Sequence, residues 1–437
     1  MQKQNWQRMI VWGVFMLLVG GYLLLALRYP HAYILATYED LIGEWAQFYL
    51  FALTMLLAAW QALRDKRFWL FFTLLSLACL YVAGDEISWG QRLFDFPTPE
   101  FFQTHNLQQE TNLHNFFTGP ISTLTKQSLE YAIAVGLVGY GFFYPQLLLC
   151  GNRLAHWLER RGLAAPPLYL CPFFILAGIL ELGLIHFNEA EIAEILIPFA
   201  LAVMTLHYRF AQRWQLEIHR EQSWRSAASG LLAGQTTLTG GVIVLAFTTT
   251  LLCYQSPRLG PAMEERYLNG VEKFAGRYMR FQQWETAALL YLEIQQEEPQ
   301  RASIRRNLYR CFRQLGYQQQ AREQMEEAIA NDLQRLKRRP ESLSARISLV
   351  RNYQLLEDAQ NSDKYLQDAL AVGQVQKEVY PQHPGVAYWL GRSYELLGDY
   401  AAAYREFKRA ANLQPDKLKY RKAQLAAGRQ LEGEGRS

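Results

Sequence analysis

Residues 84–94 read Gly-Asp-Glu-Ile-Ser-Trp-Gly-Gln-Arg-Leu-Phe, and residues 106–115 read Asn-Leu-Gln-Gln-Glu-Thr-Asn-Leu-His-Asn. The stretch lies between two strongly apolar segments, where a simple connector needs only turn residues. It holds adjacent acids, histidines and several amides instead. We therefore expect the polar stretch to form a binding or reactive site, and the apolar segments around it to set the fold.

The apolar segments have the length of membrane-spanning helices. A bilayer core about 30 Å thick needs about 20 apolar residues in a helix, which satisfies its own backbone hydrogen bonds. We expect an all-α chain with a seven-helix transmembrane domain over residues 1–256 and an outer-face polar loop over residues 84–128. The seven segments are 10–28, 46–63, 68–84, 129–149, 167–186, 191–208 and 236–255.

Basic residues recur on alternate sides of these segments. Because Lys and Arg near helix ends stay in the cytoplasm, we expect the N-terminus inside and the polar half of the chain outside. The cytoplasmic side then carries Lys3, Arg8, Arg64, Lys66, Arg67, Arg153, Arg160, Arg161, Arg209, Arg213, Arg220 and Arg225, against Arg28, Arg92, Lys126 and Arg258 opposite. This distribution predicts a multi-pass protein of a bacterial inner membrane with a periplasmic or extracellular C-terminal domain.

The same topology gathers ionisable residues at the outer face. Acids and histidines from four connections would meet there, namely Glu39, Asp40, Glu44, Asp85, Glu86, His105, Glu110, His114, Glu181, His186, Glu189, Glu191 and Glu194. Carboxylates at this depth are costly unless they face a cavity or a partner. The convergence is an inference from topology.

Four of these residues are candidates for catalysis: Asp85, Glu86, Glu110 and His114. Paired carboxylates can act as general acid and base or bind a metal ion. The alternative is an interfacial cluster in which Glu86 pairs with Arg92 and Trp89 anchors the helix end. The remaining polar residues of the motif are Ser88, Trp89, Gln91, Arg92, His105, Asn106, Asn112 and Asn115.

The spacing of Asn106, Glu110 and His114 places them on one helical face. Glu and His four residues apart can share a divalent ion such as zinc or manganese. The candidate ligands are Glu86, Glu110, His114, Glu181 and His186. A surface helix without metal is the alternative, because the second His of an HExxH motif is absent.

Composition excludes some functions. The net charge is only +4 and no basic face is visible, which argues against nucleic-acid binding. The five cysteines form no CxxC pair, so a zinc ribbon or thioredoxin-like site is not expected. Gly-rich phosphate loops and the GxSxG elbow are also missing.

From Pro257 the sequence becomes rich in Gln, Glu, Arg and Ala, and a repeat appears. Small residues alternate with aromatics at fixed positions, and about seven extra residues precede the third and the fourth copies. The copies carry Phe274, Ala275, Tyr278, Ala287, Tyr291, Ile294 and Pro299; Leu308, Phe312, Gly316, Ala321, Met325 and Ala328; Leu349, Tyr353, Leu356, Leu366 and Ala369; and Leu390, Gly391, Tyr394, Ala403, Phe407, Ala410 and Pro415.

This pattern resembles the tetratricopeptide repeat over residues 268–431, after a linker at 257–267 and before a tail at 432–437. The resemblance implies an α-solenoid of about four helix pairs whose concave face binds a peptide or protein partner, at residues that the pattern does not specify. A rigid spacer or a self-association surface is the alternative.

The first half resembles an uncharacterised bacterial multi-pass membrane family in its Asp85–Arg92 and Asn106–Asn115 motifs. Seven-helix hydrolases related to alkaline ceramidases and adiponectin receptors are a second comparison, but their HxxxH and SxxxH pairs have no counterpart here. We therefore expect a cell-envelope scaffolding or assembly protein that contacts membrane lipid and recruits a protein partner. The alternative is a membrane-embedded hydrolase or transferase that acts on a lipid or lipid-linked saccharide at the outer face, with a divalent metal as its candidate cofactor.

Overall fold

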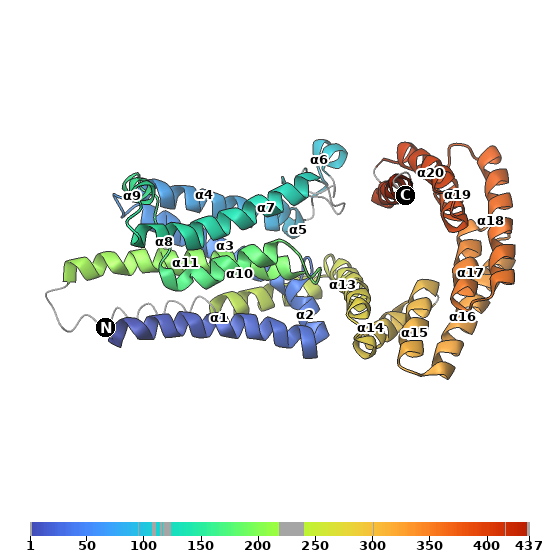
Figure 1. The fold of residues 1–437 in the computed structure, drawn as a ribbon, viewed down its shortest axis with the longest axis horizontal. Helices are drawn as coiled ribbons and strands as arrows, with labels where there is room; N and C mark the ends of the chain where they lie inside the picture. Colours follow the sequence, from blue (N-terminus) through green and yellow to red (C-terminus); the bar gives the residue numbers. More distant parts are fainter. Residues whose placement is uncertain are drawn as a thin grey trace. The chain divides into compact units, whose positions relative to one another are not determined.

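The computed structural model describes residues 2–94, 96–106, 111–113, 116, 124–217, 240–299, 301–415 and 417–434. Every regular element in these ranges is a helix, which confirms the all-α class. The chain divides into two compact units, Met1–Phe274 and Ala275–Ser437 (Figure 1). Residues 260–267, expected to be part of a linker, belong to helix α13 (Gly260–Arg280).

The first unit contains long apolar helices joined by short ones. In chain order they are α1 (Gln2–Arg28), α2 (Pro30–Thr37), α3 (Ile42–Ala62), α4 (Trp69–Glu86), η1 (Ser88–Gly90), α5 (Gln91–Phe94), α6 (Glu100–His105), α7 (Leu124–Val138), the π-helical turn η3 (Gly139–Phe143), α8 (Tyr144–Leu149), α9 (Arg153–Arg160), η4 (Leu168–Leu170), α10 (Cys171–Glu181), α11 (Glu189–Glu217), a helix at Gly240–Gln255, and the start of α13.

Five helices of the described residues are long and apolar enough to cross a membrane, by length and composition only, where seven were expected. They are Val11–Arg28, Ile42–Ala62, Trp69–Glu86, Lys126–Leu149 and Glu189–Phe210. The other two expected segments contain the shorter apolar helices Leu168–Glu181 and Gly240–Gln255. For the fifth expected segment, the sequence-based count overestimated helix length because it treated continuous apolarity as continuous helix.

The helix Leu168–Glu181 is short for a local reason. Left-handed backbone at Gly183, His186 and Asn188 ends the helical path soon after Glu181. At 1.5 Å per residue the helical part is about 21 Å long, which is less than a bilayer core of about 30 Å. In the seventh expected segment, residues 236–239 lie outside the described residues.

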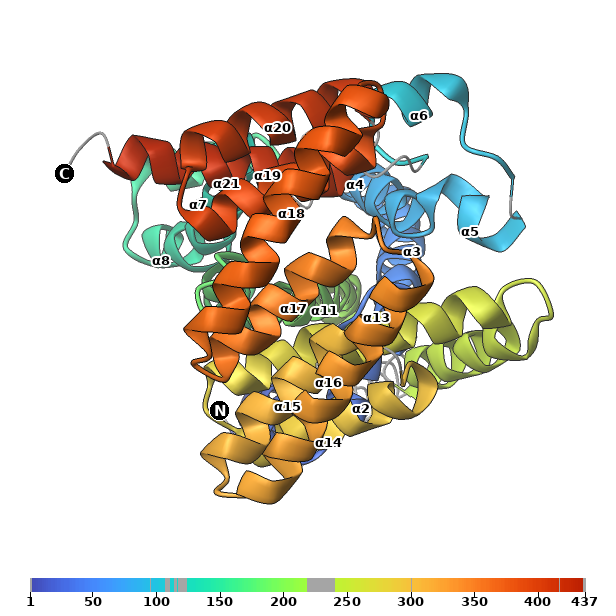
Figure 2. The same ribbon diagram turned by 90° about the vertical axis from the view of Figure 1, so that its right-hand side faces the viewer.

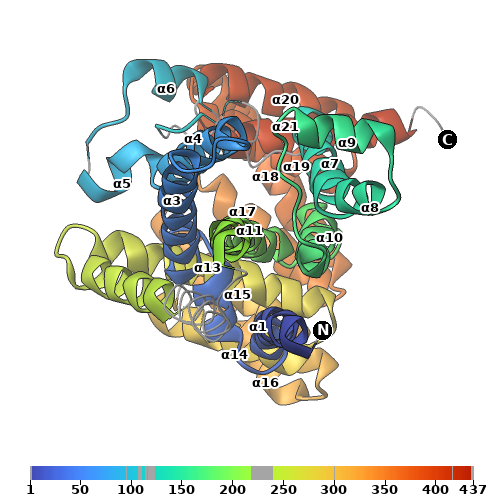
Figure 3. The ribbon, with the colours of Figure 1, turned by 90° about the vertical axis from the view of Figure 1, so that its left-hand side faces the viewer.

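Helix α11 occupies the middle of the first unit (Figure 3). Small side chains such as Ala193, Ala200 and Ala202 are fully buried and let the neighbouring helices approach closely. The core around α11 includes Leu50 of α3 and Phe173 of α10, together with residues of α1 and of the Gly240–Gln255 helix. Both shorter apolar helices therefore pack in the same core as the longer ones.

Charged residues separate to two ends of this unit. Arg64 and Arg209 lie over the Trp60 ring, and Arg67 forms an ion pair with Glu159 at 3.1 Å. We call this the basic end. Four carboxylates gather around Glu194 at the other ends of the same helices, and we call this the acidic end, defined by Glu44, Glu86, Glu181, Glu191 and Glu194.

The second unit is a row of helices that each pack against the next in sequence, and α17 also packs against α19. Figure 2 faces this unit. Its helices are α14 (Trp284–Glu297), α15 (Ala302–Gln314), α16 (Gln318–Arg338), α17 (Leu343–Leu355), α18 (Ala359–Val379), α19 (Pro384–Leu397), α20 (Tyr400–Leu413) and α21 (Leu418–Glu434). We call α14–α21 the helical array.

The array fits a tetratricopeptide-like helical repeat in which the side chains buried between helices are those that the pattern singled out. Ala287, Tyr291 and Ile294 of the first copy are at most 2% exposed, and Leu390 and Phe407 of the last are fully buried. A Cβ on Gly391 would lie 2.7 Å from the Phe407 ring, so the close helix approach requires glycine there. Leu356 is an exception, since it is exposed at the end of α17.

The extra residues in the middle of the repeat lengthen helices. Helices α16 and α18 each have 21 residues, whereas α14 and α20 have 14. The difference of seven residues is two helical turns, so the insertions extend the second helices of two pairs and leave the pairing of neighbours intact.

Candidate functional site

The polar stretch after α4 is held together by side chains that bind backbone groups. Asp85 is buried in the last turn of α4, and its Oδ1 accepts a hydrogen bond from the backbone N–H of Leu113 at 2.8 Å. Gln91 accepts from the N–H of Thr111 at 2.8 Å and donates to the hydroxyl of Thr98 at 2.7 Å. Both residues therefore fasten an irregular chain segment to a helix end.

A tight turn follows Asp85 and Glu86. Ser88, Trp89 and Gly90 all have left-handed backbone, with φ of 46°, 52° and 91°. This conformation is costly for residues other than glycine, and such strain concentrates at sites where surrounding structure demands it. The Trp89 ring lies over Gly84, where an added Cβ would be 3.0 Å from the indole.

Asn106 and Asn112 form a second fastening. The Nδ2 of Asn106 donates to the backbone carbonyl of Asn112 at 2.8 Å and to its Oδ1 at 3.0 Å. Both amides are almost completely buried. Buried amides that satisfy one another and the backbone have a structural role.

The expected convergence of acids is visible in part. Glu44 of α3, Glu86 of α4, Glu181 of α10 and Glu191 of α11 all lie within electrostatic range of Glu194. Glu191 also accepts a hydrogen bond from Gln47 at 3.0 Å. The acidic end thus brings carboxylates from separate helices together, as the topology predicted, although the role of these carboxylates stays a prediction.

The described residues contain no group of three or more His, Cys, Asp or Glu side chains that could hold a metal ion. His186 is exposed. Of the other candidates, Glu110, His114 and Asn115 lie outside the described residues, as do the side chains of Arg92 and His105. The proposed catalytic and metal-binding roles therefore remain predictions.

Glu189, also expected at the outer face, acts on the backbone. Its carboxylate accepts hydrogen bonds from the N–H groups of Ile185 at 2.5 Å, His186 at 2.9 Å and Phe187 at 2.6 Å. The side chain is 4% exposed. It therefore holds the turn between α10 and α11, at the start of the central helix.

A cavity of about 220 Å³ lies beside the polar stretch, with Ser88, Gln91 and Arg258 in its wall. Asp40 and Arg266 in the same wall form an ion pair. Burial lowers the pKa of the Arg266 guanidinium, and the charge of nearby Glu39 opposes that effect. Asp40 and Arg266 thus neutralise each other in this wall.

The helical array contains a larger cavity, of about 310 Å³, that sequence reasoning did not locate. First helices of successive pairs form it: α15, α17 and α19, with one residue from α16. The lining residues are Arg301, Ala302, Ser303, Arg306, Arg335, Ser344, Ile347, Ser348, Arg351 and Trp389. We call it the arginine cavity.

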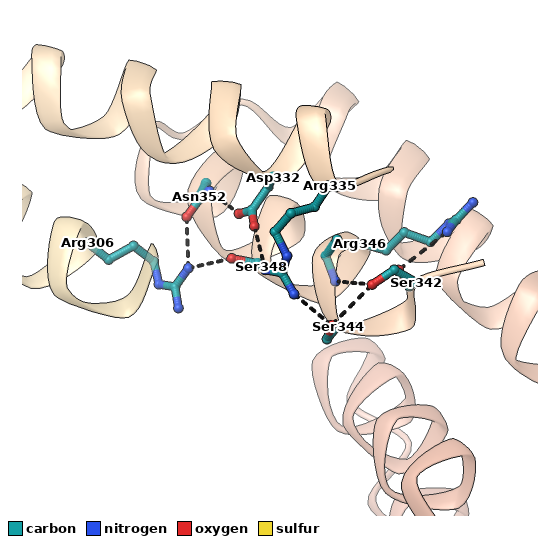
Figure 4. Close-up of polar contacts among 9 residues, drawn as sticks. Arg306, Asp332, Arg335, Ser342, Ser344, Arg346, Ser348 and Asn352 are labelled. Atoms are coloured by element: carbon teal, nitrogen blue, oxygen red, sulfur yellow. Dashed lines mark hydrogen bonds and ion pairs between the residues drawn. The ribbon is translucent and has the colours of Figure 1, made fainter. Parts of the chain in front are cut away.

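A buried carboxylate organises one wall of the arginine cavity (Figure 4). Asp332 is fully buried, pairs with Arg335 at 3.1 Å and accepts a hydrogen bond from Asn352 at 3.1 Å. Burial raises the pKa of Asp332, while a hydrogen bond from Ser348 and the charge of Arg335 act in the opposite direction. The network fixes the polar side chains of α16 and α17.

Arg306 is attached to that network by neutral groups. Its guanidinium donates to Ser348 Oγ at 2.8 Å and to Asn352 Oδ1 at 3.0 Å. Burial and the positive charges of Arg351 and Arg310 together lower the pKa of Arg306 to about 10, against the opposing charge of Asp332. Burial, and then the charge of Arg392, likewise lower the pKa of Arg351. The cavity therefore collects cations that repel one another.

Trp389 contributes to the walls of both the arginine cavity and a second cavity of about 250 Å³. Ser344 is also common to the two walls. The spacing of Arg306, Arg310 and Arg313 places them on one helical face, but only Arg306 of the three lines the cavity. What the sequence lacked was the neighbouring helices that supply the rest of the wall.

No family model matches the chain. No curated protein matches it either, so the resemblance to an uncharacterised multi-pass membrane family gains no support. A solved structure, that of a thermophilic TPR protein in Thermus thermophilus, is similar at 23% sequence identity with a TM-score of 0.24. The match covers 38% of this chain and 82% of that chain.

Proposed function

We propose that the chain is an integral protein of a bacterial inner membrane that recruits a protein partner outside the cytoplasm. In this proposal α14–α21 form a tetratricopeptide-like solenoid, and the partner docks on the face made by α15, α17 and α19. The observation that carries the proposal is the cavity along these first helices, since it offers a preformed recess across three repeats.

Exposed apolar surface supports the membrane part of the proposal. Only 6% of the Val11–Arg28 window is buried inside the protein, against 61% of Glu189–Phe210. Large side chains such as Leu17, Val244 and Phe247 are more than half exposed. Many exposed large apolar side chains are unfavourable in water and suit contact with lipid.

Charge separation supports the orientation. Arg64, Arg67 and Arg209 lie together at the basic end, as expected of a cytoplasmic face. The acidic end, with the polar stretch 84–115, would then face outward. Together these features favour a scaffolding or assembly role in the cell envelope, with lipid contacts in the first unit and protein contacts in the array.

Trp389 is the residue that we expect to carry most of the partner's binding energy. It lines both cavities of the array and is half-buried. Aromatic side chains at the centre of a recess are the commonest energetic anchors of protein interfaces, and their truncation typically costs about 2 kcal/mol or more. A ligand lying along α15, α17 and α19 would contact this ring.

The test is recovery of bound proteins after mild crosslinking in native membranes and purification of the full chain. We expect Trp389→Ala to reduce the recovered partner about 30-fold, the equivalent of about 2 kcal/mol. Trp284→Ala is the matched control, because Trp284 is a half-buried tryptophan of α14 outside both cavity walls. Equal recovery by wild type and Trp389→Ala would refute docking on this face.

A further inference from the structure

The arginine cavity has a chemical composition that goes beyond a general docking surface. Its wall contains four guanidinium groups, of Arg301, Arg306, Arg335 and Arg351, and three serine hydroxyls, of Ser303, Ser344 and Ser348. Guanidinium and hydroxyl groups donate hydrogen bonds to oxyanions, and arginine binds phosphate and carboxylate in two-point geometry. The occupant should therefore be an anion.

Two of the four positive charges are already neutralised. Arg301 pairs with Glu298 at 2.8 Å, and Arg335 pairs with Asp332 at 3.1 Å. Arg306 and Arg351 have no carboxylate within ion-pair distance among the described residues. The cavity thus holds two cations outside any ion pair of the described residues, which matches the charge of about −1.5 to −2 on a phosphomonoester at neutral pH.

A helix end adds to this positive field. Helix α15 begins at Ala302 inside the cavity wall, and Arg301 at its N-cap makes no side-chain capping hydrogen bond. The first N–H groups of a helix have no partner within the helix and carry a partial positive charge, which favours anions. Phosphate groups bind at such ends when cationic side chains converge on them.

We propose that the arginine cavity binds the phosphate group of its ligand, with Arg306 and Arg351 as the charge partners and the first turn of α15 and the hydroxyls of Ser303 and Ser344 as further donors. The inference rests on the proposed function in taking α15–α19 as the ligand-binding face, and it names the chemistry recognised there. A soluble phosphate ester and a phospholipid headgroup both carry this group.

The test is titration of the detergent-purified full chain, in a phosphate-free buffer, with sn-glycerol 3-phosphate. We expect saturable binding to wild type and a roughly 10- to 100-fold higher dissociation constant for Arg306→Gln and for Arg351→Gln, because each loses a charge-assisted hydrogen bond. The matched control is Arg322→Gln, on the exposed surface of α16 outside the cavity, which should bind as wild type does.

Further titrations separate the source of the phosphate. Short-chain phosphatidic acid that binds more tightly than glycerol 3-phosphate, with the same dependence on Arg351, would identify a lipid headgroup, whereas equal affinity would identify a soluble ester. Equal binding of a tetraglutamate peptide would overturn the assignment to phosphate, as would an equal loss in Arg322→Gln. Absence of glycerol 3-phosphate binding alongside Trp389-dependent partner recovery would end the phosphate inference and leave the proposed function standing.

Discussion

The polar stretch of the first unit and the arginine cavity of the second use their polar side chains in opposite ways. Asp85, Gln91 and Glu189 accept hydrogen bonds from backbone N–H groups of irregular segments. Arg306 and Arg351, in contrast, lie within helices α15 and α17, and Arg306 donates to the side chains of Ser348 and Asn352 instead of to backbone groups. The first set completes the fold, whereas we propose that the second set binds a ligand.

The difference follows from where the chain leaves regular structure. Every buried backbone N–H needs an acceptor, and a turn between helices cannot supply all of them from its own carbonyls. Acidic and amide side chains beside such turns are therefore often structural, even when they cluster as a catalytic site would. A polar cluster on helix faces has no unpaired backbone N–H groups to satisfy. The free-energy cost of burying its charges therefore points more directly to ligand binding.

The largest expected effect tests the structural role of the polar side chains in the first unit. Glu189→Ala should destabilise the first unit by about 3–5 kcal/mol, because three backbone N–H groups of the α10–α11 turn lose a buried acceptor. The measurement is thermal unfolding of the purified chain in detergent. Glu264→Ala, at an exposed position of α13, is the control and should unfold as wild type does. Unchanged unfolding of Glu189→Ala would mean that the turn finds other acceptors, and the contrast between the two regions would lose its strongest example.

A smaller loss of stability is expected at Asp85, and two substitutions there distinguish a structural role from a catalytic one. Asp85→Ala should cost about 2 kcal/mol, since the N–H of Leu113 loses its buried acceptor. Asp85→Asn should cost clearly less, because the amide oxygen can still accept that hydrogen bond. The same unfolding measurement compares the two variants.

If Asp85→Asn destabilises the chain as much as Asp85→Ala, the negative charge itself matters at this position. Asp85 would then belong with the functional carboxylates of the acidic end.

The fold class was predictable because helix-forming patterns are local. Apolar runs and the spacing of Ala287, Tyr291, Leu390 and Phe407 specified an all-α chain with repeated helix pairs, and these side chains are buried. The helix count was wrong because helix ends depend on single residues. The left-handed turn after Glu181 is not visible as a change in apolarity.

The candidate site was predictable only as far as topology reaches. Alternating spans placed Glu44, Glu86, Glu181 and Glu191 at one end, and the structure brings them near Glu194. Hydrogen bonds such as that from Leu113 to Asp85 join residues far apart in sequence, so no local sequence pattern predicted them. The arginine cavity was missed for the same reason, because its charges come from α15, α16 and α17.

The smallest expected effect is a stabilisation, opposite in sign to the effects of Glu189→Ala and Asp85→Ala, and it tests the arginine cavity of the second unit. Arg351→Gln should stabilise the unliganded chain by about 0.5 kcal/mol, because it removes a cation that burial disfavours and that Arg392 and Arg310 repel, an effect reduced by the attraction of Glu395 and by solvent screening. The gain should shrink at high salt, which screens like-charge repulsion. With saturating sn-glycerol 3-phosphate the order should reverse, since a ligand bound more tightly by wild type stabilises wild type more. A loss above about 1 kcal/mol without ligand would instead make Arg351 a structural residue, like Glu189.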